Sequence, residues 1–299
     1  MRIGITGASG MLGSVLLDYL SNSYKVFATS RSKSIENKNI QWNCFDLTDT
    51  ASLNKWLKNT KPDLVIHCAA IVNVDFCEKN IGLASVLHVE TTRVIANYLE
   101  DHNARLIYIS TDSVFDGKKQ GTYIESDSVE PLNVYAKTKL MGENITQSVS
   151  KGLVLRTNII GWTKEGKISF AEWVLKGLVD HDPVNLFYDV YFSPLHVENL
   201  SSIIERIINN PISGIYHCAS RDSISKYDFG MQLAKVFNLS NSNIKRVSVD
   251  DMNFKAERPK NMTLDIDKIT SVLKYDFPCV SDAIALMKMQ YDTNIKLLN

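Results

Sequence analysis

A glycine-rich turn near the start of the chain limits what this sequence can fold into more than any other feature. The apolar segment Arg2–Thr6 is strand-like, and three glycines follow it in a G-x-x-G-x-x-G spacing that opens a helix near residues 11–21. A residue without a Cβ permits a tight turn and close backbone approach, and the start of a helix presents free N–H groups and a positive dipole end. The spacing therefore predicts a strand–turn–helix unit that holds a dinucleotide pyrophosphate through Gly7, Gly10, Met11, Leu12 and Gly13.

The rest of the first half repeats the strand–helix pattern. Apolar strands are expected at 25–29, 40–45, 63–68, 104–110 and 152–157, and amphipathic helices at 51–59, 83–101 and 134–149. Such alternation implies right-handed crossovers and an α/β fold, a Rossmann-like doubly wound parallel sheet. We expect residues 1–160 to form the dinucleotide-binding domain.

The pattern loosens after residue 160. Helices are expected at 169–179, 196–208, 226–237 and 280–290, short strands at 184–187 and 215–218, and a loop-rich polar stretch at 238–261. We expect residues 161–299 to form mainly a smaller C-terminal substrate-binding lobe, with some segments returning to the core.

Composition excludes several classes of protein. The formal net charge is zero and no long basic run occurs, which argues against a nucleic-acid partner. The five cysteines form no C-x-x-C pair and have no metal-ligand spacing, so we expect free thiols and no metal. The N-terminus does not resemble a signal peptide, and no apolar run reaches the roughly 18 residues that would span a bilayer. We expect a cytoplasmic protein with no membrane partner.

Residues at the ends of the next strands indicate which dinucleotide is bound. The second strand ends at Thr29-Ser30-Arg31-Ser32, without the acid that would bind a ribose 2′-OH, and Arg31 can pair with a 2′-phosphate. NADP(H) is therefore favoured, with NAD(H) as the alternative. Asp46 and Leu47 follow the third strand and can reach an adenine edge, although Asp46 could equally cap the next helix. Ala69 and Ala70 follow the fourth strand and are small enough for close backbone approach.

A tyrosine and a lysine four residues apart form the candidate catalytic pair. Tyr135 and Lys139 fall on one face of a predicted helix, where the ammonium would stabilise a phenolate and lower the pKa of the tyrosine. Thr111 stands at the end of the fifth strand, and ligands of open parallel sheets bind at that edge. Thr111, Tyr135 and Lys139 are thus predicted to act together on a carbonyl group.

These motifs resemble the extended short-chain dehydrogenases/reductases, and specifically the dTDP-4-dehydrorhamnose reductase group. The resemblance extends over residues 7–13, 68–78, 110–117, 131–143, 155–157 and 256–264. It implies an NADPH-dependent oxidoreductase that reduces a 4-keto group on a nucleotide-linked deoxysugar, as in dTDP-rhamnose biosynthesis for cell-wall polysaccharide. Thr111 would position the carbonyl, Tyr135 would deliver the proton, and Lys139 would tune Tyr135 and bind the nicotinamide ribose. The residues expected to contact the nucleotide-sugar are Val114, Asn158 and Arg258, although Arg258 could instead form an ordinary ion pair.

Two departures from that group leave alternatives open. His88 stands where many members carry an asparagine that holds a relay water, and it could substitute for that residue or be a packed core histidine. Ser113 replaces an aromatic residue of the pocket wall, and it also replaces the acid of the related 4,6-dehydratases. A nucleotide-sugar epimerase or dehydratase, or a non-catalytic NADP-binding regulatory subunit, is the alternative function. A homodimer is a further expectation.

Overall fold

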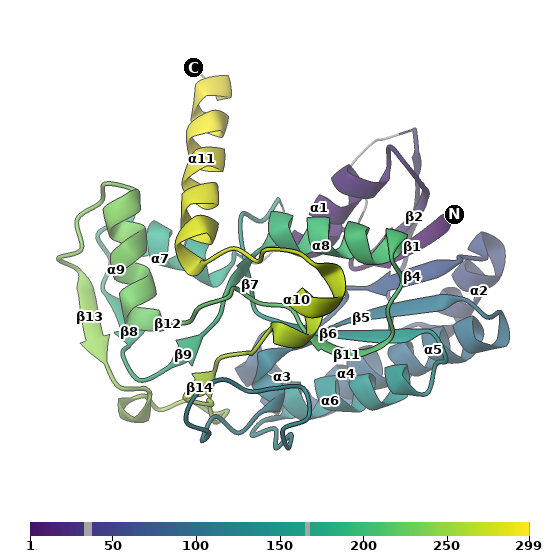
Figure 1. Ribbon diagram of the computed structural model, residues 1–299, viewed down its shortest axis with the longest axis horizontal. Helices are drawn as coiled ribbons and strands as arrows, with labels where there is room; N and C mark the ends of the chain where they lie inside the picture. The colour runs from purple at the N-terminus through teal and green to yellow at the C-terminus, as the bar shows by residue number, and fades with distance from the viewer. Residues whose placement is uncertain (33–37, 165–167, 299) are drawn as a thin grey trace.

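The computed structural model describes residues 1–32, 38–164 and 168–298, and its centre is a seven-stranded parallel sheet (Figure 1). The strand order is β11-β6-β5-β4-β1-β2-β3, so the direction of the order reverses at β1. This reversal creates a crevice at the carboxyl ends of β1 and β4, where dinucleotides bind in such folds. The strands are β1 (Arg2–Thr6), β2 (Lys25–Ser30), β3 (Ile40–Cys44), β4 (Leu64–His67), β5 (Arg105–Thr111), β6 (Gly152–Thr157) and β11 (Gly214–His217).

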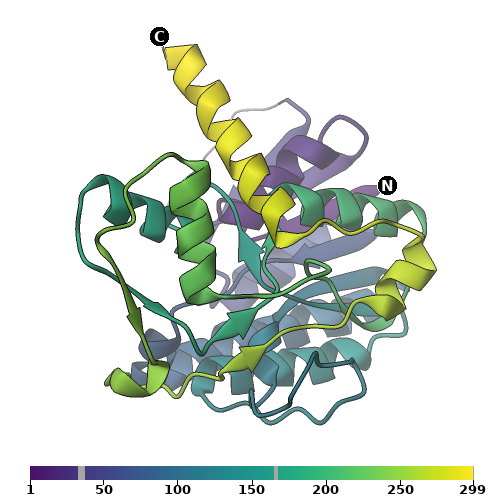
Figure 2. The same cartoon turned by 60° about the vertical axis from the view of Figure 1, so that its left-hand side comes forward.

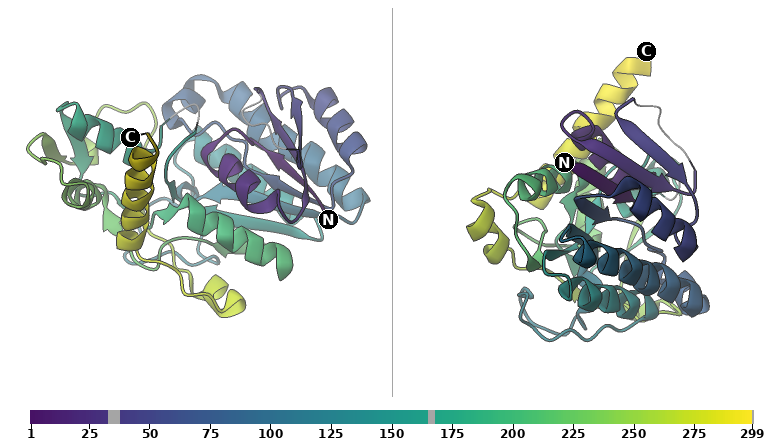
Figure 3. Two further views of the ribbon diagram at one scale, coloured as in Figure 1. Left: turned by 90° about the horizontal axis from the view of Figure 1, so that it is seen from above. Right: turned by 90° about the vertical axis from the view of Figure 1, so that its right-hand side faces the viewer.

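Helices cover both faces of this sheet because its strands are apolar on both sides. On one face, α1 (Met11–Leu20) and α8 (Val197–Asn209) share a hydrophobic core with the strands. On the other face lie α2 (Thr50–Thr60), α5 (Thr91–Asp101) and α6 (Val134–Gln147) (Figure 3). The predicted doubly wound α/β fold is confirmed.

The predicted helix over 83–101 is not one regular helix. It begins with α4 (Ile81–Ser85), passes through a π-helical turn η1 (Val86–Glu90) and continues as α5. A short helix that the sequence did not predict, α3 (Val74–Lys79), precedes it. π-turns insert a residue into a helix and re-aim the side chains on it. Here the π-turn contains His88, which it directs at α6.

The C-terminal half has a second hydrophobic core of its own (Figure 2). It contains α7 (Phe170–Val179), α9 (Lys226–Val236) and the buried start of α11 (Val280–Leu298), which then extends away from the body. The stretch expected to be loop-rich contains β13 (Ile244–Val247), paired with β8 (Val184–Phe187), and a short helical turn η3 (Val249–Asp251). β11 and α8, although late in sequence, belong to the main sheet and its covering layer.

Short strands and a small helix complete the second half. A three-stranded sheet joins β12 (Ile224–Ser225), β9 (Tyr191–Phe192) and β14 (Asn261–Met262), and β7 (Ile159–Ile160) pairs with β10 (Leu195–His196). The helix α10 (Asp267–Leu273) packs beside β11. In the described part of the chain, no helix has the length and apolar character needed to cross a bilayer.

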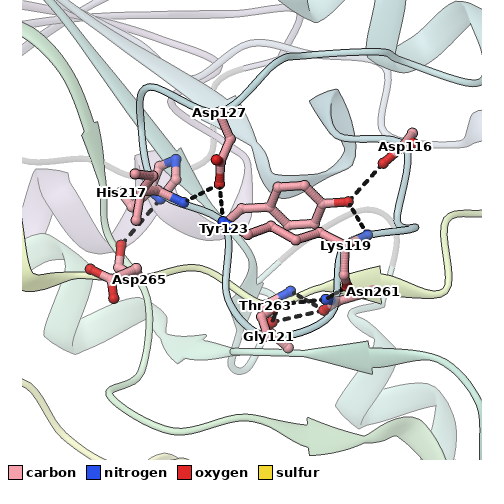
Figure 4. Close-up of polar contacts among 10 residues, drawn as sticks. Asp116, Lys119, Gly121, Tyr123, Asp127, His217, Asn261, Thr263 and Asp265 are labelled. Carbon is pink, nitrogen blue, oxygen red and sulfur yellow. Dashed lines mark hydrogen bonds and ion pairs between the residues drawn. The ribbon is translucent and has the colours of Figure 1, made fainter.

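A junction ties the loop after β5 to the strand β14 (Figure 4). Tyr123 donates a hydrogen bond from its hydroxyl to Asp116 (2.7 Å), and Asn261 donates from its amide to the carbonyls of Lys119 and Gly121 (both 2.7 Å). Gly117 has a φ of +76°, and a Cβ added there would lie 2.6 Å from the backbone N of Lys260. The junction therefore fixes residues 258–262 beside the loop that begins at Thr111.

Replacement of Gly117 tests this junction. Gly117→Ala is expected to lower the free energy of unfolding by about 2–4 kcal/mol, because left-handed strain adds to a clash with Lys260. The matched control is Gly121→Ala, which has a φ of +84° but nothing within 4 Å of the added Cβ, and should cost about 1–2 kcal/mol. Urea unfolding of both variants measures the difference. Equal losses would mean that the close approach to Lys260 does not matter.

Candidate active site

The glycine turn forms a close-packed cradle at the carboxyl end of β1. Gly7 has a φ of +64°, and a Cβ there would lie 2.8 Å from both the Cα and the N of Ala69 at the end of β4. A Cβ on Gly13 would lie 2.3 Å from the carbonyl oxygen of Gly7. Gly10 is the N-cap of α1 and has no side chain to bond the amides of the first helical turn. The cradle therefore fits a pyrophosphate held by backbone N–H groups.

The residues beside the three glycines have different environments. Leu12 is buried in the core beneath the sheet, while Met11 and Ala70 are half-buried. The side chain of Leu47 is buried between the sheet and α2, so an adenine could meet only its backbone.

Arg31 and Asp46 lie exposed at the same edge of the sheet. Hydrogen bonds from the backbone and hydroxyl of Thr48 hold the pKa of Asp46 below its usual range, and the charge of Arg31 adds to this. Asp46 does not cap the next helix; Asp49 does, accepting from the backbone N of Ala51 and Ser52. The capping alternative for Asp46 is wrong, and its carboxylate remains exposed beside Arg31.

The start of α6 carries the Tyr135–Lys139 pair. Asn133 caps this helix and also donates a hydrogen bond to the carbonyl of Glu257 (3.0 Å), which ties the helix start to the second half of the chain. Lys139 is buried, donates to the carbonyl of Ile109 (2.6 Å) and lies 4.0 Å from the ring centroid of Tyr108. Burial lowers the pKa of Lys139 to about 7, and the carboxylate of Glu143 opposes that shift.

Tyr135 meets Thr111 at the carboxyl end of β5. Burial raises the pKa of Tyr135 above its ordinary value, a hydrogen bond with Thr111 lowers it, and the carboxylate of Asp112 raises it. The expected depression of this pKa is wrong for the protein as it stands, because burial outweighs the effect of any neighbour. The phenol therefore keeps its proton at neutral pH, as a general acid must.

Asp112 organises the turn that follows β5, although the sequence analysis did not single it out. It is buried and accepts hydrogen bonds at Oδ1 from the hydroxyls of Thr111 (3.0 Å) and Ser113 (3.1 Å). Its Oδ2 accepts from the side-chain amide of Asn158 (2.7 Å), and burial raises its pKa. Asn158 thus lies at the turn after β5, and its contact with the sugar stays a prediction. Val114 is fully buried in the core, so the prediction that it contacts the substrate is wrong for its side chain.

His88 packs against the catalytic helix with both ring nitrogens engaged. Its Nε2 accepts a hydrogen bond from the backbone N of Ile71 (2.9 Å), so Nδ1 carries the proton and faces the hydroxyl of Thr138 (2.8 Å). Burial lowers the pKa of His88 to about 3, and the nearby charge of Lys139 adds to this. Both contacts are those of a packed histidine, which is the alternative that this geometry favours.

Arg258 forms the ion pair that the sequence left open. Its Nη2 lies 2.9 Å from Oδ2 of Asp75 on α3, and Asp75 also accepts from the backbone N of Ala256 (3.0 Å). The guanidinium remains partly exposed and lies 5.0 Å from the ring centroid of Phe254. Among the described residues, no group of three or more His, Cys, Asp or Glu side chains is placed to hold a metal ion.

Comparison with known proteins identifies the family. Residues 1–292 match the family model described as the RmlD substrate binding domain. The chain belongs to this family. The resemblance to the dTDP-4-dehydrorhamnose reductase group is thereby confirmed.

Three similar proteins show what members of this group do. The dTDP-4-dehydrorhamnose reductase of Aggregatibacter actinomycetemcomitans is 30% identical over 283 residues, which cover 90% of this chain and 92% of that protein. Methionine adenosyltransferase 2 subunit beta of Xenopus laevis is 32% identical over 277 residues, covering 90% and 81%. A dTDP-4-dehydrorhamnose reductase from Bacillus anthracis, solved in complex with NADP, is 26% identical with a TM-score of 0.85, covering 97% and 99%.

A buried ion pair supports the site of this RmlD-family chain from beneath. Glu143 on α6 and Arg156 on β6 are 1% and 2% exposed, with Nη2 and Oε2 2.8 Å apart. The hydroxyl of Ser110, next to Thr111, donates to the same carboxylate (2.5 Å). One carboxylate thus joins the catalytic helix to β5 and β6.

Removing the negative charge of Glu143 is expected to lower the free energy of unfolding. Glu143→Gln leaves the guanidinium of Arg156 buried without a counter-ion and is expected to cost about 3–5 kcal/mol of unfolding free energy. The control is Asp18→Asn, which removes an exposed ion pair with Lys164 and should change stability little. Chemical denaturation measures both. A loss in Glu143→Gln as small as the control's would contradict the supporting role.

Proposed function

We propose that this chain is an NADPH-dependent reductase of a 4-keto group on a nucleotide-linked deoxysugar, working in the cytoplasm. The observation that carries the proposal is the meeting of Thr111, Tyr135 and buried Lys139 at the carboxyl end of β5. That end lies next in the sheet to β4 and close to the glycine cradle at β1. An alcohol, a phenol and an ammonium together match what carbonyl reduction needs.

The cradle and its surroundings favour NADP(H). Gly7 and Gly13 permit the close-packed turn that such a pyrophosphate site requires, and Arg31 stands exposed at the end of β2, where a 2′-phosphate would lie. The reductase from Bacillus anthracis was solved with NADP, which supports the same choice here. NAD(H) remains the alternative. With either cofactor, Asp46 and Leu47 would reach the adenine edge, and Ala69 and Ala70 would let the backbone approach the cofactor.

The chain's own residues would position the carbonyl and supply the proton. The bound cofactor supplies a hydride to the carbonyl carbon. The hydroxyl of Thr111, which now donates to Asp112, can turn to donate to the carbonyl oxygen, and Tyr135 gives that oxygen the proton from its hydroxyl. Lys139 then stabilises the phenolate that remains, because an ammonium beside a phenolate favours the charged form.

The substrate side of the proposal rests on two polar residues. Asn158 faces the catalytic turn through Asp112, and Arg258 keeps a partly exposed guanidinium next to α3. A guanidinium fits a diphosphate, since its fork of N–H donors matches phosphate oxygens. Arg258 would therefore exchange part of its bond to Asp75 for the substrate diphosphate.

The direct test is loss of NADPH absorbance with a panel of dTDP-, UDP- and GDP-linked 4-keto sugars. We expect consumption with at least one of them, and the nucleotide that works identifies the base. No consumption with any member would reject the reductase.

A non-catalytic NADP-binding regulatory subunit is the second candidate. It is favoured by the likeness to methionine adenosyltransferase 2 subunit beta, at 32% identity over 90% of this chain. Tight NADPH binding without consumption of any keto sugar would support this candidate. An epimerase or dehydratase is less supported, because Ser113 stands where the dehydratase motif has an acid and its hydroxyl is bonded to Asp112.

Removal of the proton donor should separate binding from turnover. Tyr135→Phe is expected to keep cofactor affinity and to lower kcat by about 10²–10⁴, because only general-acid catalysis is lost. The control is Lys137→Ala, an exposed residue on the same helix, which should retain kcat. Steady-state rates and NADPH titrations measure the two effects. Near-wild-type turnover in Tyr135→Phe would remove this residue from the mechanism.

Removal of the basic residue at the end of β2 should change cofactor preference. Arg31→Ala is expected to weaken NADPH binding by about tenfold or more and NADH binding little, because only NADPH carries the 2′-phosphate. Fluorescence titration with both cofactors measures this, with Arg93→Ala on α5 as an exposed control. Equal losses for the two cofactors would show that Arg31 does not contact the 2′-phosphate.

A further inference from the structure

A small sheet from the second half lies against the catalytic turn. The hydroxyl of Ser113 contacts the sulfur of Met262 on β14 (3.7 Å), and Met262 is in register with Phe192 on β9. Phe192 is in turn in register with Ile224 on β12. Lys226 follows β12 directly as the first residue of α9. The sheet therefore connects the turn at Asp112 with Lys226, a residue without any role in the activity described above.

The ammonium of Lys226 is held in an apolar environment. It lies 4.1 Å from the ring centroid of Phe170 and 4.3 Å from that of Phe192, and Phe192 is fully buried. Among the described residues, none accepts a hydrogen bond or forms an ion pair with this ammonium. Lys226 is half-buried, and its three N–H donors have no acceptor among those residues. Cation–π contact offsets only part of what a cation loses on leaving water.

Burial and two nearby charges act on the pKa of this ammonium. Burial lowers the pKa of Lys226 to about 8, the carboxylate of Asp112 opposes the shift, and the guanidinium of Arg258 adds to it. Contacts through Phe192 and Met262, which touches Ser113, connect Lys226 to the turn that contains Asp112. In its ammonium form, Lys226 has three N–H donors and no acceptor.

Asp112 offers the complementary group. Its Oδ1 already accepts two hydrogen bonds and its Oδ2 accepts one, whereas a carboxylate has about four acceptor sites. Within the described part of the chain, one site on Oδ2 therefore has no donor. A sugar hydroxyl has one donor and two acceptor lone pairs, so it can donate to Oδ2 of Asp112 and accept from Nζ of Lys226.

We infer that Lys226 and Asp112 hold a hydroxyl of the sugar ring, on a carbon near the reacting keto group, and so select the sugar of the substrate. The inference rests on the proposed ligand class, a nucleotide-linked sugar, but not on its reduction. A packing role for Lys226 is the competing explanation. The two explanations predict different effects of Lys226 on fold stability. A lysine kept only for packing should stabilise the fold, whereas a lysine kept for a ligand should not.

The test compares a nucleotide diphosphate with and without its sugar. Calorimetric titration uses dTDP and dTDP-rhamnose on protein saturated with NADPH, since the alcohol cannot react with the reduced cofactor. If the substrate panel selects UDP or GDP, the corresponding pair replaces them. The variant is Lys226→Met, which keeps length and removes charge, and the control is Lys235→Met, an exposed residue on the same helix.

Lys226→Met is expected to weaken dTDP-rhamnose binding by about 10–100-fold, the worth of a hydrogen bond to a charged group, and dTDP binding by less than about twofold. Its melting temperature should equal or exceed that of the wild type, because a desolvated charge has been removed. Lys235→Met should match the wild type in all three measurements.

Other outcomes would overturn the inference. Equal losses for dTDP and dTDP-rhamnose would make Lys226 a phosphate contact, and unchanged affinities or a lowered melting temperature would make it a packing residue. A wild type that binds dTDP-rhamnose no more tightly than dTDP has no sugar site to which Lys226 could contribute. A wild type that prefers the sugar nucleotide but reduces no keto sugar would reject the proposed reductase alone.

Discussion

The buried carboxylate of Glu143 is the interaction on which the rest of the site depends. It receives hydrogen bonds from Ser110 on β5 and from Arg156 on β6, while Glu143 itself belongs to α6. Ser110 precedes Thr111, and Lys139 lies one turn before Glu143 on α6. Together with the hydrogen bond from Lys139 to the carbonyl of Ile109, this carboxylate holds Thr111 of the sheet and the Tyr135–Lys139 pair of the helix in position. Because this ion is inaccessible to water, its bonds are costly to break and the spacing is rigid.

Burial also shifts the pKa values of the ionisable groups in the site. It lowers the pKa of Lys139 to about 7 and of Lys226 to about 8, and it raises those of Tyr135 and Asp112. Each shift has desolvation as its largest cause, so the site as a whole disfavours isolated charge. A phenol in such surroundings stays protonated until a negative charge forms next to it. This favours proton donation to a developing alkoxide over the resting phenolate that the spacing of Tyr135 and Lys139 suggested.

The sequence predicted the features that follow from hydrophobic periodicity and from the chemistry of neighbouring residues. The strands at 152–157 and 184–187, the glycine cradle and the gathering of Thr111, Tyr135 and Lys139 all depend on neighbours in the sequence or on the edge of a parallel sheet. Asp112, Glu143 and Lys226 were missed because their importance arises from partners far along the chain, such as Asn158, Arg156 and Phe192. β13 was missed for the same reason, since its polar sequence pairs only with β8. The predicted direction of the Tyr135 pKa shift was wrong. Periodicity places a charge beside the phenol, but it does not show how far burial removes water from the phenol.

The free energy that is lost when polar groups are buried bears on whether the chain is a reductase or a binding subunit. Dinucleotide binding needs the cradle at Gly7 and a group such as Arg31, both at the edge of β1 and β2. It does not need a carboxylate buried beside Thr111, nor a lysine whose ammonium lies against two phenyl rings with no acceptor among the described residues. Perturbed ionisable groups gather where chemistry or recognition uses them, since elsewhere apolar residues would pack at lower cost. Asp112 belongs to the turn after β5, and Lys226 begins α9 beside the small sheet that contacts this turn through Met262, so both groups are placed as the proposed sugar site requires.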